Sequence, residues 1–213
     1  MLSARLQKIA DMVLYNSLVD IGSDHALLPI SLLLSGRIKR AIAADIAPLP
    51  LERGRVNAVR HGVVQSIDFK LTDGLLGLDF GYESCVIAGM GGESIMHILR
   101  DELDVAHSFK QLILSPQRDL PLVRRFLHTH GFEITDEVML IENGKFYNIL
   151  DCKVGIVEEY NETEYIFGHH LINKKCPVLA QYLKSEIEKF SRFGTDRHFE
   201  YISLCKEVLK CIK

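Results

Sequence analysis

Apolar and polar positions follow two different rhythms along the first two thirds of the chain. Short apolar runs bounded by turn residues predict strands at residues 17–21, 41–46, 84–88 and 111–114, and an alternating apolar and polar pattern predicts another at 67–71. Apolar residues that recur every three or four positions predict helices at residues 2–13, 26–34, 48–60, 93–100 and 119–130. This alternation predicts an α/β fold, a parallel sheet with helices on both faces.

The end of the predicted sheet differs from its beginning. Strand-like runs at residues 132–140 and 145–153 are joined through Glu142-Asn143-Gly144, and Asn-Gly is a strong hairpin signal. A Rossmann-like sheet that finishes in a β-hairpin resembles the class I methyltransferase fold, in which the final strand inserts antiparallel to its neighbours. Plain dinucleotide-binding domains lack this ending.

The pattern changes again after Val157. An acidic connector at 158–164 precedes two helical stretches, whose apolar stripes are Val178 and Tyr182, then Ile202, Cys205, Leu209 and Ile212. We therefore predict a Rossmann-like methyltransferase domain at residues 1–157 and a small helical, coiled-coil extension at 165–213, folded as a helical hairpin.

Charge is distributed unevenly between these two parts. The chain of 213 residues has a net charge of -3, yet residues 168–213 hold nine Lys and Arg against five Asp and Glu. The remaining residues hold sixteen basic and twenty-three acidic side chains. The basic tail is therefore a candidate surface for a polyanion, and a solvated helical face is the alternative.

Several classes of protein are disfavoured by the composition. Arg5, Lys8 and Asp11 interrupt the N-terminal apolar residues, so that stretch does not read as a signal peptide, and no uncharged segment is long enough to span a bilayer. The five cysteines contain no C-x-x-C pair, and the nine histidines show no metal-ligand spacing. We expect a cytoplasmic protein with reduced thiols and no metal site.

The first predicted strand leads into a turn that suits a cofactor. Asp20-Ile21-Gly22-Ser23-Asp24-His25 runs straight into a helix, where Rossmann-like folds place their ligand. The G-x-G-x-x-G spacing of dinucleotide sites is missing, and Asp24 would repel a pyrophosphate. S-adenosylmethionine has no phosphate but carries a cationic centre and an amino group, so it fits this acidic turn better.

The next three strand ends add to the same candidate site. Asp45 closes the second strand at the distance expected for an acid that binds ribose hydroxyls, and Asp73-Gly74 follows the third, where an acid can hold the adenine amine. The fourth ends in Gly89-Met90-Gly91, which lets backbone approach a ligand. Each turn alone also fits an ordinary strand end. Together they predict cofactor contacts from Asp20, Gly22, Asp45, Asp73, Gly74, Gly89, Met90 and Gly91.

Four segments together resemble the bacterial TrmK family of tRNA adenine N1-methyltransferases. They are Leu2-Ser3-x-Arg5-Leu6, the turn from Asp20 to Ala26, the glycine-rich turn from Ile87 to Gly92, and the hairpin from Asn143 to Leu150. The similarity spans about residues 1–153, and the tail resembles the family's C-terminal extension in pattern. It implies methylation of N1 of adenine 22 in tRNA, with S-adenosyl-L-methionine as donor.

The resemblance also assigns expected roles to individual residues. Asp24 is the candidate for stabilising positive charge on the adenine or for accepting a hydrogen bond from its amino group. His25 is expected to shape the pocket or to transfer a proton, and packing at the helix start is the alternative. Where the family has Gln-Pro-Asn, this chain has Ser115-Pro116-Gln117, so Pro116 and Gln117 are the expected base contacts. The basic tail is expected to grip tRNA, aided by Arg5, Arg118, Arg124 and Arg125.

Two other functions remain open at this point. The same fold can methylate a small molecule or a protein, with the tail serving in dimerisation, and the negative overall charge favours that reading. A cofactor-binding or RNA-binding module without catalysis is the other. For the tRNA enzyme we expect a monomer or weak homodimer.

Overall fold

The structure is a computed structural model that describes residues 2–78, 80–192 and 196–212. Within these residues, seven strands form one sheet in the order β3-β2-β1-β4-β5-β7-β6. Their bounds are β1 Ser17–Ile21, β2 Arg40–Asp45, β3 Ile67–Leu71, β4 Ser84–Ala88, β5 Gln111–Ser115, β6 Phe132–Glu142 and β7 Lys145–Val154.

Strand direction confirms the predicted hairpin ending. β1 to β5 pair in parallel, whereas β7 pairs antiparallel with both β5 and β6. β7 therefore inserts between the last parallel strand and β6, with Asn143 and Gly144 turning the chain in left-handed backbone conformations. The expected α/β sheet with a terminal hairpin is confirmed.

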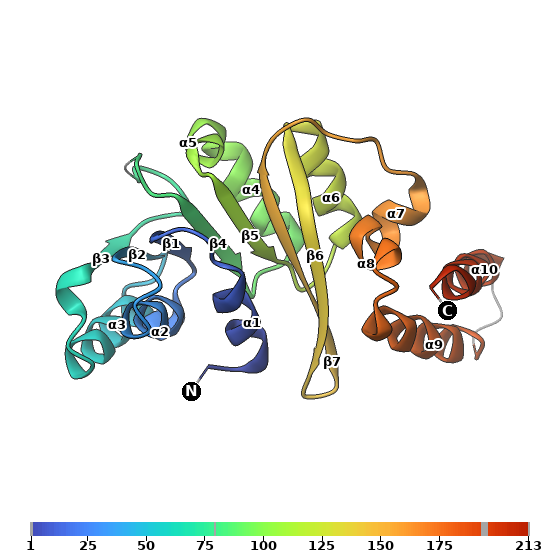
Figure 1. The fold of residues 1–213 in the computed structure, drawn as a ribbon, viewed down its shortest axis with the longest axis horizontal. Helices are drawn as coiled ribbons and strands as arrows, with labels where there is room; N and C mark the ends of the chain where they lie inside the picture. The colour runs from blue at the N-terminus through green and yellow to red at the C-terminus, as the bar shows by residue number, and fades with distance from the viewer. Residues whose placement is uncertain (1, 79, 193–195, 213) are drawn as a thin grey trace.

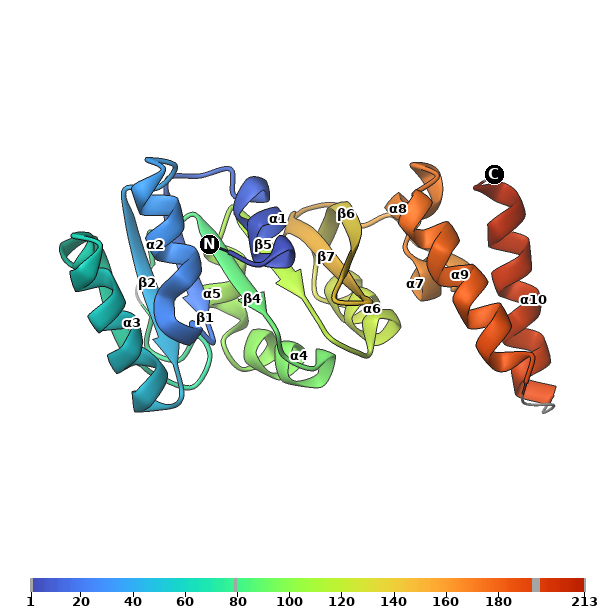
Figure 2. The ribbon, with the colours of Figure 1, turned by 90° about the horizontal axis from the view of Figure 1, so that it is seen from below.

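Helices cover both faces of the sheet (Figures 1 and 2). One face carries α1 (Ala4–Met12), α2 (Leu27–Leu34) and α3 (Pro48–Arg60), and the other carries α4 (Gly92–Asp101), α5 (Leu103–Ser108) and α6 (Leu120–Thr129). Successive strand residues point to opposite faces, so Leu18 packs in one apolar cluster and Val19 in the other. Burial on both faces explains why these strands have continuous apolar runs. A short helical turn, η2 (Val64–Ser66), precedes β3.

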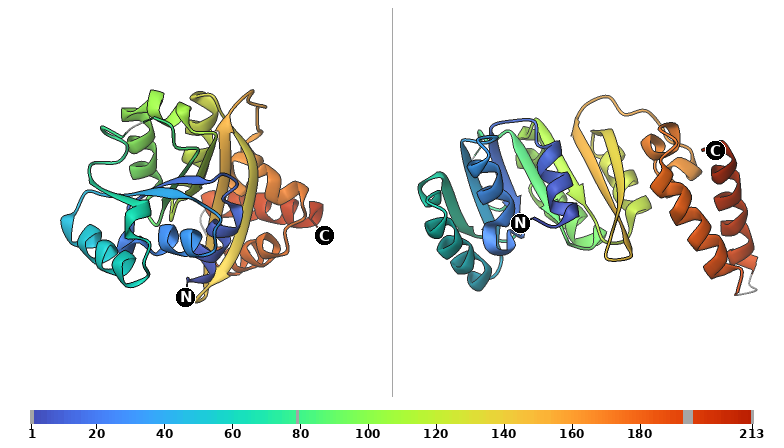
Figure 3. Two further views of the ribbon diagram at one scale, coloured as in Figure 1. Left: turned by 60° about the vertical axis from the view of Figure 1, so that its left-hand side comes forward. Right: turned by 60° about the horizontal axis from the view of Figure 1, so that its bottom comes forward.

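The C-terminal part consists of α7 (Glu162–Phe167), α8 (His169–Asn173), α9 (Pro177–Phe190) and α10 (Asp196–Cys211). α9 and α10 lie side by side and project from the β6 end of the molecule (Figure 3). Their apolar residues form a cluster with side chains of β6 and β7, including Leu179, Leu183, Cys205, Met139 and Phe146. The predicted helical pair therefore packs against the sheet's hairpin.

The predicted connector at 158–164 is wrong at its C-terminal end, because α7 begins inside it. Asn161 Oδ1 accepts a hydrogen bond from the Glu164 N–H at 3.0 Å, and Glu164 Oε2 accepts from the Asn161 N–H at 2.8 Å. This reciprocal pair is a capping box, which starts the helix, and the acidic side chains of the first turn interact favourably with the helix dipole.

A buried ion pair fastens the C-terminal part to the main sheet. The Arg124 side chain is 1% exposed, and its Nε lies 2.7 Å from Glu137 Oε1 on β6. Its Nη1 donates to the carbonyl oxygens of Tyr165 at 2.7 Å and Ile166 at 3.1 Å in α7. The expectation that Arg124 helps to hold tRNA at the protein surface is wrong, because this side chain is enclosed and already paired. No helix in the described part of the chain is long and apolar enough to cross a membrane.

Candidate cofactor and substrate site

The carboxyl ends of neighbouring parallel strands enclose a cavity of about 260 Å³. Its lining includes five of the predicted cofactor residues, namely Gly22, Asp45, Asp73, Gly74 and Met90. The strand register explains this convergence, because Ile21 pairs with Ala44 and with Ile87, and Asp45 pairs with Leu71. Side chains that follow these positions therefore meet at one edge of the sheet, as predicted.

The backbone at Gly22 holds the turn after β1 close to β2. Gly22 has φ +71°, a left-handed conformation that favours glycine, and the N–H groups of Gly22 and Ser23 both donate to the Ala44 carbonyl, at 2.8 and 3.0 Å. A Cβ added at Gly22 would lie 2.3 Å from Met90 Cε. The Met90 side chain from the glycine-rich turn therefore covers the turn after β1.

Asp20 lies beneath this turn and does not line the cavity. Its carboxyl is buried, and Oδ2 accepts a hydrogen bond from Ser23 Oγ at 2.6 Å. Burial raises the pKa of Asp20 to about 7, against the lowering effect of the Ser23 hydrogen bond, and the negative charge of Asp45 adds to the rise. A carboxyl group with a pKa near neutrality therefore lies directly below the candidate ligand site.

Asp24 and His25 belong to a strained short helix, η1 (Asp24–Ala26). His25 and Ala26 both have left-handed backbone, with φ 60° and 51°, so α2 begins at Leu27. The Asn57 side chain donates to the His25 carbonyl at 3.2 Å, and His25 Nε2 lies 3.3 Å from the exposed Asp24 carboxylate. Neither residue lines the cavity. Consecutive strained residues that the surroundings hold in place are frequent at functional sites.

The glycine-rich turn after β4 touches the loop after β5. The Gln117 N–H donates to the Met90 carbonyl at 2.9 Å, and the Arg118 side chain lies over Gly91. Pro116 is buried, whereas Gln117 and Arg118 are exposed. The structure thus brings Gln117 and Arg118 beside the candidate cofactor turn, and Pro116 shapes the loop that carries them.

Arg5 reaches the same turn from the N-terminal helix. Its guanidinium lies 5.0 Å from the centre of the Tyr147 ring, and a Cβ added at Gly89 would be 3.6 Å from Arg5 Nη2. Nε and Nη1 of Arg5 are buried and have no hydrogen-bond partner among the described residues. Buried donors without partners are rare in native proteins, so this cation is available to a ligand at the strand ends.

Comparison with known proteins places the chain in a family. Residues 18–203 match the family model of TrmK, tRNA (adenine(22)-N(1))-methyltransferase. The chain belongs to this family. The tRNA (adenine(22)-N(1))-methyltransferase of Bacillus subtilis is 35% identical over 156 residues, which cover 72% of this chain and 66% of that enzyme, just under two thirds of its length.

Solved structures agree with the family assignment. Sp1610 of Streptococcus pneumoniae, crystallised in complex with S-adenosyl-L-methionine, is 36% identical, with a TM-score of 0.93 over 98% of this chain and 100% of that chain. The Bacillus subtilis TrmK structure is 27% identical, with a TM-score of 0.78 over 100% and 97% of the two chains. The predicted family and class I methyltransferase fold are confirmed, and the ligand of the Streptococcus pneumoniae structure is the cofactor predicted for this chain.

No cavity-lining residue from α4 was predicted from the sequence of this TrmK family member. Ser94, His97 and Ile98 line the cavity together with Ile46 and Thr72. Their spacing along the helix places Ser94, His97 and Ile98 on one face. The sequence spacing could therefore have predicted these lining residues. The helix starts at the glycine-rich turn, so one of its faces must lie toward the strand ends.

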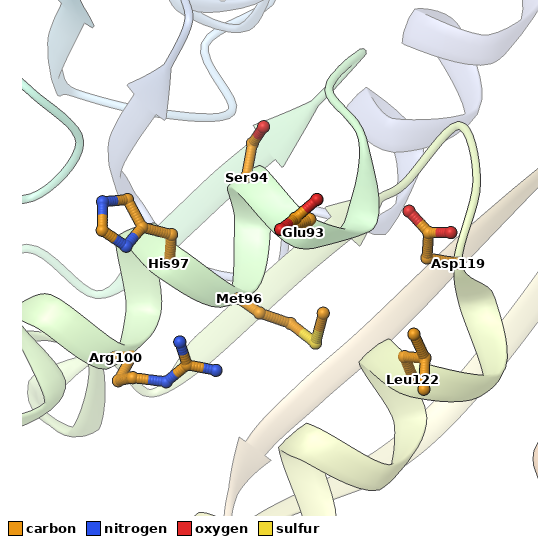
Figure 4. A pocket seen from close by; sticks show the side chains of 7 residues that line it. All are labelled: Glu93, Ser94, Met96, His97, Arg100, Asp119 and Leu122. Atoms are coloured by element: carbon orange, nitrogen blue, oxygen red, sulfur yellow. The ribbon is translucent and has the colours of Figure 1, made fainter.

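A larger cavity of about 610 Å³ adjoins this one between α4 and α6 (Figure 4). It is lined by Glu93, Ser94, Met96, His97, Arg100, Asp119 and Leu122. In the close view, Met96 extends from α4 toward Leu122 on α6. Ser94 and His97 line both cavities, so α4 forms the boundary that they share.

The chemistry of the smaller cavity fits S-adenosylmethionine. Carboxylates of Asp45 and Asp73 can accept hydrogen bonds from hydroxyl and amino groups, and Ile46, Met90 and Ile98 supply apolar walls for a flat ring. Two carboxylates in one small cavity disfavour a phosphate-bearing ligand.

Proposed function

We propose that this TrmK family member transfers the methyl group of S-adenosylmethionine to N1 of adenine 22 in tRNA. The observation that carries the proposal is the convergence of Gly22, Asp45, Asp73 and Met90 on one cavity at the strand ends. The family match, over residues 18–203, supplies the substrate. The same reasoning favours tRNA over a small-molecule or protein acceptor.

Cofactor contacts are distributed over the four strand ends in this proposal. Asp45 accepts hydrogen bonds from the ribose hydroxyls, and Asp73 with Gly74 holds the adenine amine. Asp20, below the turn at Gly22, offers negative charge to the cationic part of the cofactor. Gly89, Met90 and Gly91 provide close backbone approach on the opposite side.

The chemical step requires little covalent work from the protein. When bound, the cofactor supplies an electrophilic methyl group, and the N1 lone pair of adenine attacks it directly. The protein must align the two reactants and accommodate positive charge on the base. Asp24 is the proposed group for that charge or for the adenine amine. His25, 3.3 Å from the Asp24 carboxylate, orients it.

The tRNA is held by groups on both sides of the glycine-rich turn. Arg5 contributes side-chain donors without a hydrogen-bond partner in the described part of the chain, and Gln117 and Arg118 extend from the loop that Pro116 shapes. We further propose that residues 1–157 carry out catalysis, and that the basic extension at 165–213 binds tRNA backbone. The protein would act in the cytoplasm, where tRNA is available, as a monomer or weak homodimer.

Methyl transfer from labelled S-adenosylmethionine to unmodified tRNA, followed by nucleoside analysis, tests the proposed reaction. N1-methyladenosine is the expected product. Label in a small-molecule or protein acceptor with none in tRNA would favour the alternative methyltransferase. Cofactor binding without transfer to any acceptor would indicate a non-catalytic module.

Charge reversal tests the role of the tail. Lys184 and Lys206 lie on α9 and α10, are exposed, and form no ion pair among the described residues. The variants Lys184→Glu and Lys206→Glu should weaken tRNA binding and each lower the slope of log affinity against log salt by about 1, without changing cofactor affinity. Lys39→Glu, at the amino end of β2, is the matched control. Equal tRNA binding by all three variants would contradict the proposed role.

A further inference from the structure

A separate cavity of about 330 Å³ lies between the sheet's hairpin, the loop after β5 and the C-terminal helices. Asn148 and Phe146 line it from β7, Gln117 from the loop, and Tyr182 and Tyr201 from α9 and α10. This cavity shares no lining residue with the cofactor cavity. The two cavities are connected through Gln117, whose N–H donates to the Met90 carbonyl at 2.9 Å.

Asn148 has an unusual environment for an amide side chain. The residue is 7% exposed, its Oδ1 is buried without a partner, and its carboxamide makes no hydrogen bond among the described residues. Its backbone is satisfied, because the Asn148 carbonyl accepts from Ser115 Oγ at 2.9 Å. A buried carboxamide oxygen without a donor destabilises the folded state. Its presence on a cavity wall indicates a ligand that donates a hydrogen bond to Oδ1, and the amide nitrogen can donate to an acceptor on the same ligand.

Aromatic rings also line the cavity. Phe146 and Tyr182 meet edge to face with their centroids 5.3 Å apart, and the hydroxyl oxygens of Tyr182 and Tyr201 are 3.4 Å apart. Tyr201 also donates to Glu186 Oε2 at 3.3 Å. Burial raises the pKa of both tyrosines, which keeps the rings neutral. Neutral rings near a polar amide are the usual components of a pocket for a nucleobase.

We propose that this cavity binds one unpaired nucleobase of the tRNA, stacked on the Tyr182 or Phe146 ring and hydrogen-bonded by the Asn148 carboxamide. This inference rests on the proposed function. We assign this cavity to a base other than adenine 22, because it shares no lining residue with the cofactor cavity, whereas the reacting N1 must come within bonding reach of the cofactor's methyl group. Arg118, exposed on the loop that forms one wall, supplies a cation for the adjoining phosphate.

Binding of unmodified tRNA to full-length variants tests the proposal. Tyr182→Leu removes an aromatic wall, and Asn148→Leu removes the amide. Each should raise the Kd for tRNA about tenfold or more, while the Kd for S-adenosylmethionine stays at the wild-type value. The matched controls are Tyr15→Leu and Asn16→Leu, which lie just before β1 at the amino end of the sheet. They should bind both ligands normally.

Thermal unfolding separates a ligand-binding role from a structural one. Because the Asn148 amide is unpaired in the free protein, Asn148→Leu should raise the Tm by about 2–4 °C while tRNA binding weakens. A tRNA with a single abasic nucleotide at the bound position should bind the wild type more weakly, with no further loss in Asn148→Leu. Wild-type tRNA affinity in both Asn148→Leu and Tyr182→Leu would overturn the proposal. A lowered Tm in Asn148→Leu, with partial unfolding large enough to explain its weaker tRNA binding, would also overturn it.

Failure of this inference differs from failure of the proposed function. If the wild-type protein forms N1-methyladenosine and both variants bind tRNA normally, the second base site is wrong and the reaction stands. If the wild-type protein binds S-adenosylmethionine but methylates no tRNA, the proposed function is wrong.

Discussion

Replacing Asp20 by asparagine is expected to remove a large part of the pH dependence of the protein's stability. The Asp20 carboxyl is buried, and its pKa in the folded protein is raised to about 7, whereas an aspartate in an unfolded chain titrates near about 3.9. Between these values the folded state binds a proton that the unfolded state has lost. The contribution of Asp20 to stability is therefore largest at acid pH and is lost as the pH rises through 7.

The size of this effect follows from the pKa shift. Between pH 5 and the folded pKa of about 7, a span of roughly two pH units, the folded carboxyl keeps a proton that the unfolded chain has already lost. At about 1.4 kcal/mol per unit, the wild type should lose about 3 kcal/mol of unfolding free energy through this group. Asp20→Asn keeps an acceptor for Ser23 Oγ, which lies 2.6 Å away, and removes the ionisation.

Urea unfolding followed by circular dichroism at pH 5, 6, 7 and 8 measures the difference. The stability of the variant relative to the wild type should increase by about 3 kcal/mol from pH 5 to pH 8. Saturating S-adenosylmethionine should reduce this difference, because the positive charge of the cofactor favours ionised Asp20. Parallel curves for the two proteins would refute the idea that Asp20 titrates near neutrality.

Three further substitutions have defined consequences. Arg124→Ala leaves Glu137 as an unpaired buried charge and should cost about 3–5 kcal/mol in urea unfolding, most of which Arg124→Met with Glu137→Leu should restore. Gly22→Ala places a methyl group against Met90 in a left-handed backbone and should abolish detectable cofactor binding in calorimetry, with the fold retained by circular dichroism. Asp45→Ala removes the proposed ribose contact and should weaken cofactor binding by about 1–3 kcal/mol, roughly fivefold to 150-fold, in the same assay. Wild-type cofactor affinity in either cavity variant would contradict the assigned cofactor contacts.

The central strands of the sheet were predictable because they are buried on both faces, whereas the edge strand β3 was predictable from its alternating apolar and polar residues. The predicted strands at 17–21, 67–71 and 84–88 coincide with β1, β3 and β4. Helix α5 was not predicted, since six residues are too few to establish a helical rhythm. The start of α7 did have a local signal, the Asn161 and Glu164 capping pair, which the acidic composition of the segment concealed.

The candidate site was predictable where it depends on strand ends. Gly22, Asp45 and Asp73 follow three strands, and topology alone brings them together. The left-handed backbone at His25 has no sequence signature, because the surrounding contacts hold it, including the Asn57 hydrogen bond to its carbonyl. The burial of Arg124 could not be predicted from the sequence either, because its partner Glu137 lies on a different element.

Position-specific methyl transfer tests the central claim most directly. Two versions of one unmodified tRNA, with adenine or guanine at position 22, would be incubated with labelled S-adenosylmethionine and the wild type or Asp24→Ala. We expect N1-methyladenosine only from the wild type acting on the tRNA with adenine 22. Asp24→Ala should bind the cofactor but transfer far less methyl. Equal N1-methyladenosine from both tRNAs, or none from either with the cofactor bound, would contradict the assignment of adenine 22 as the target.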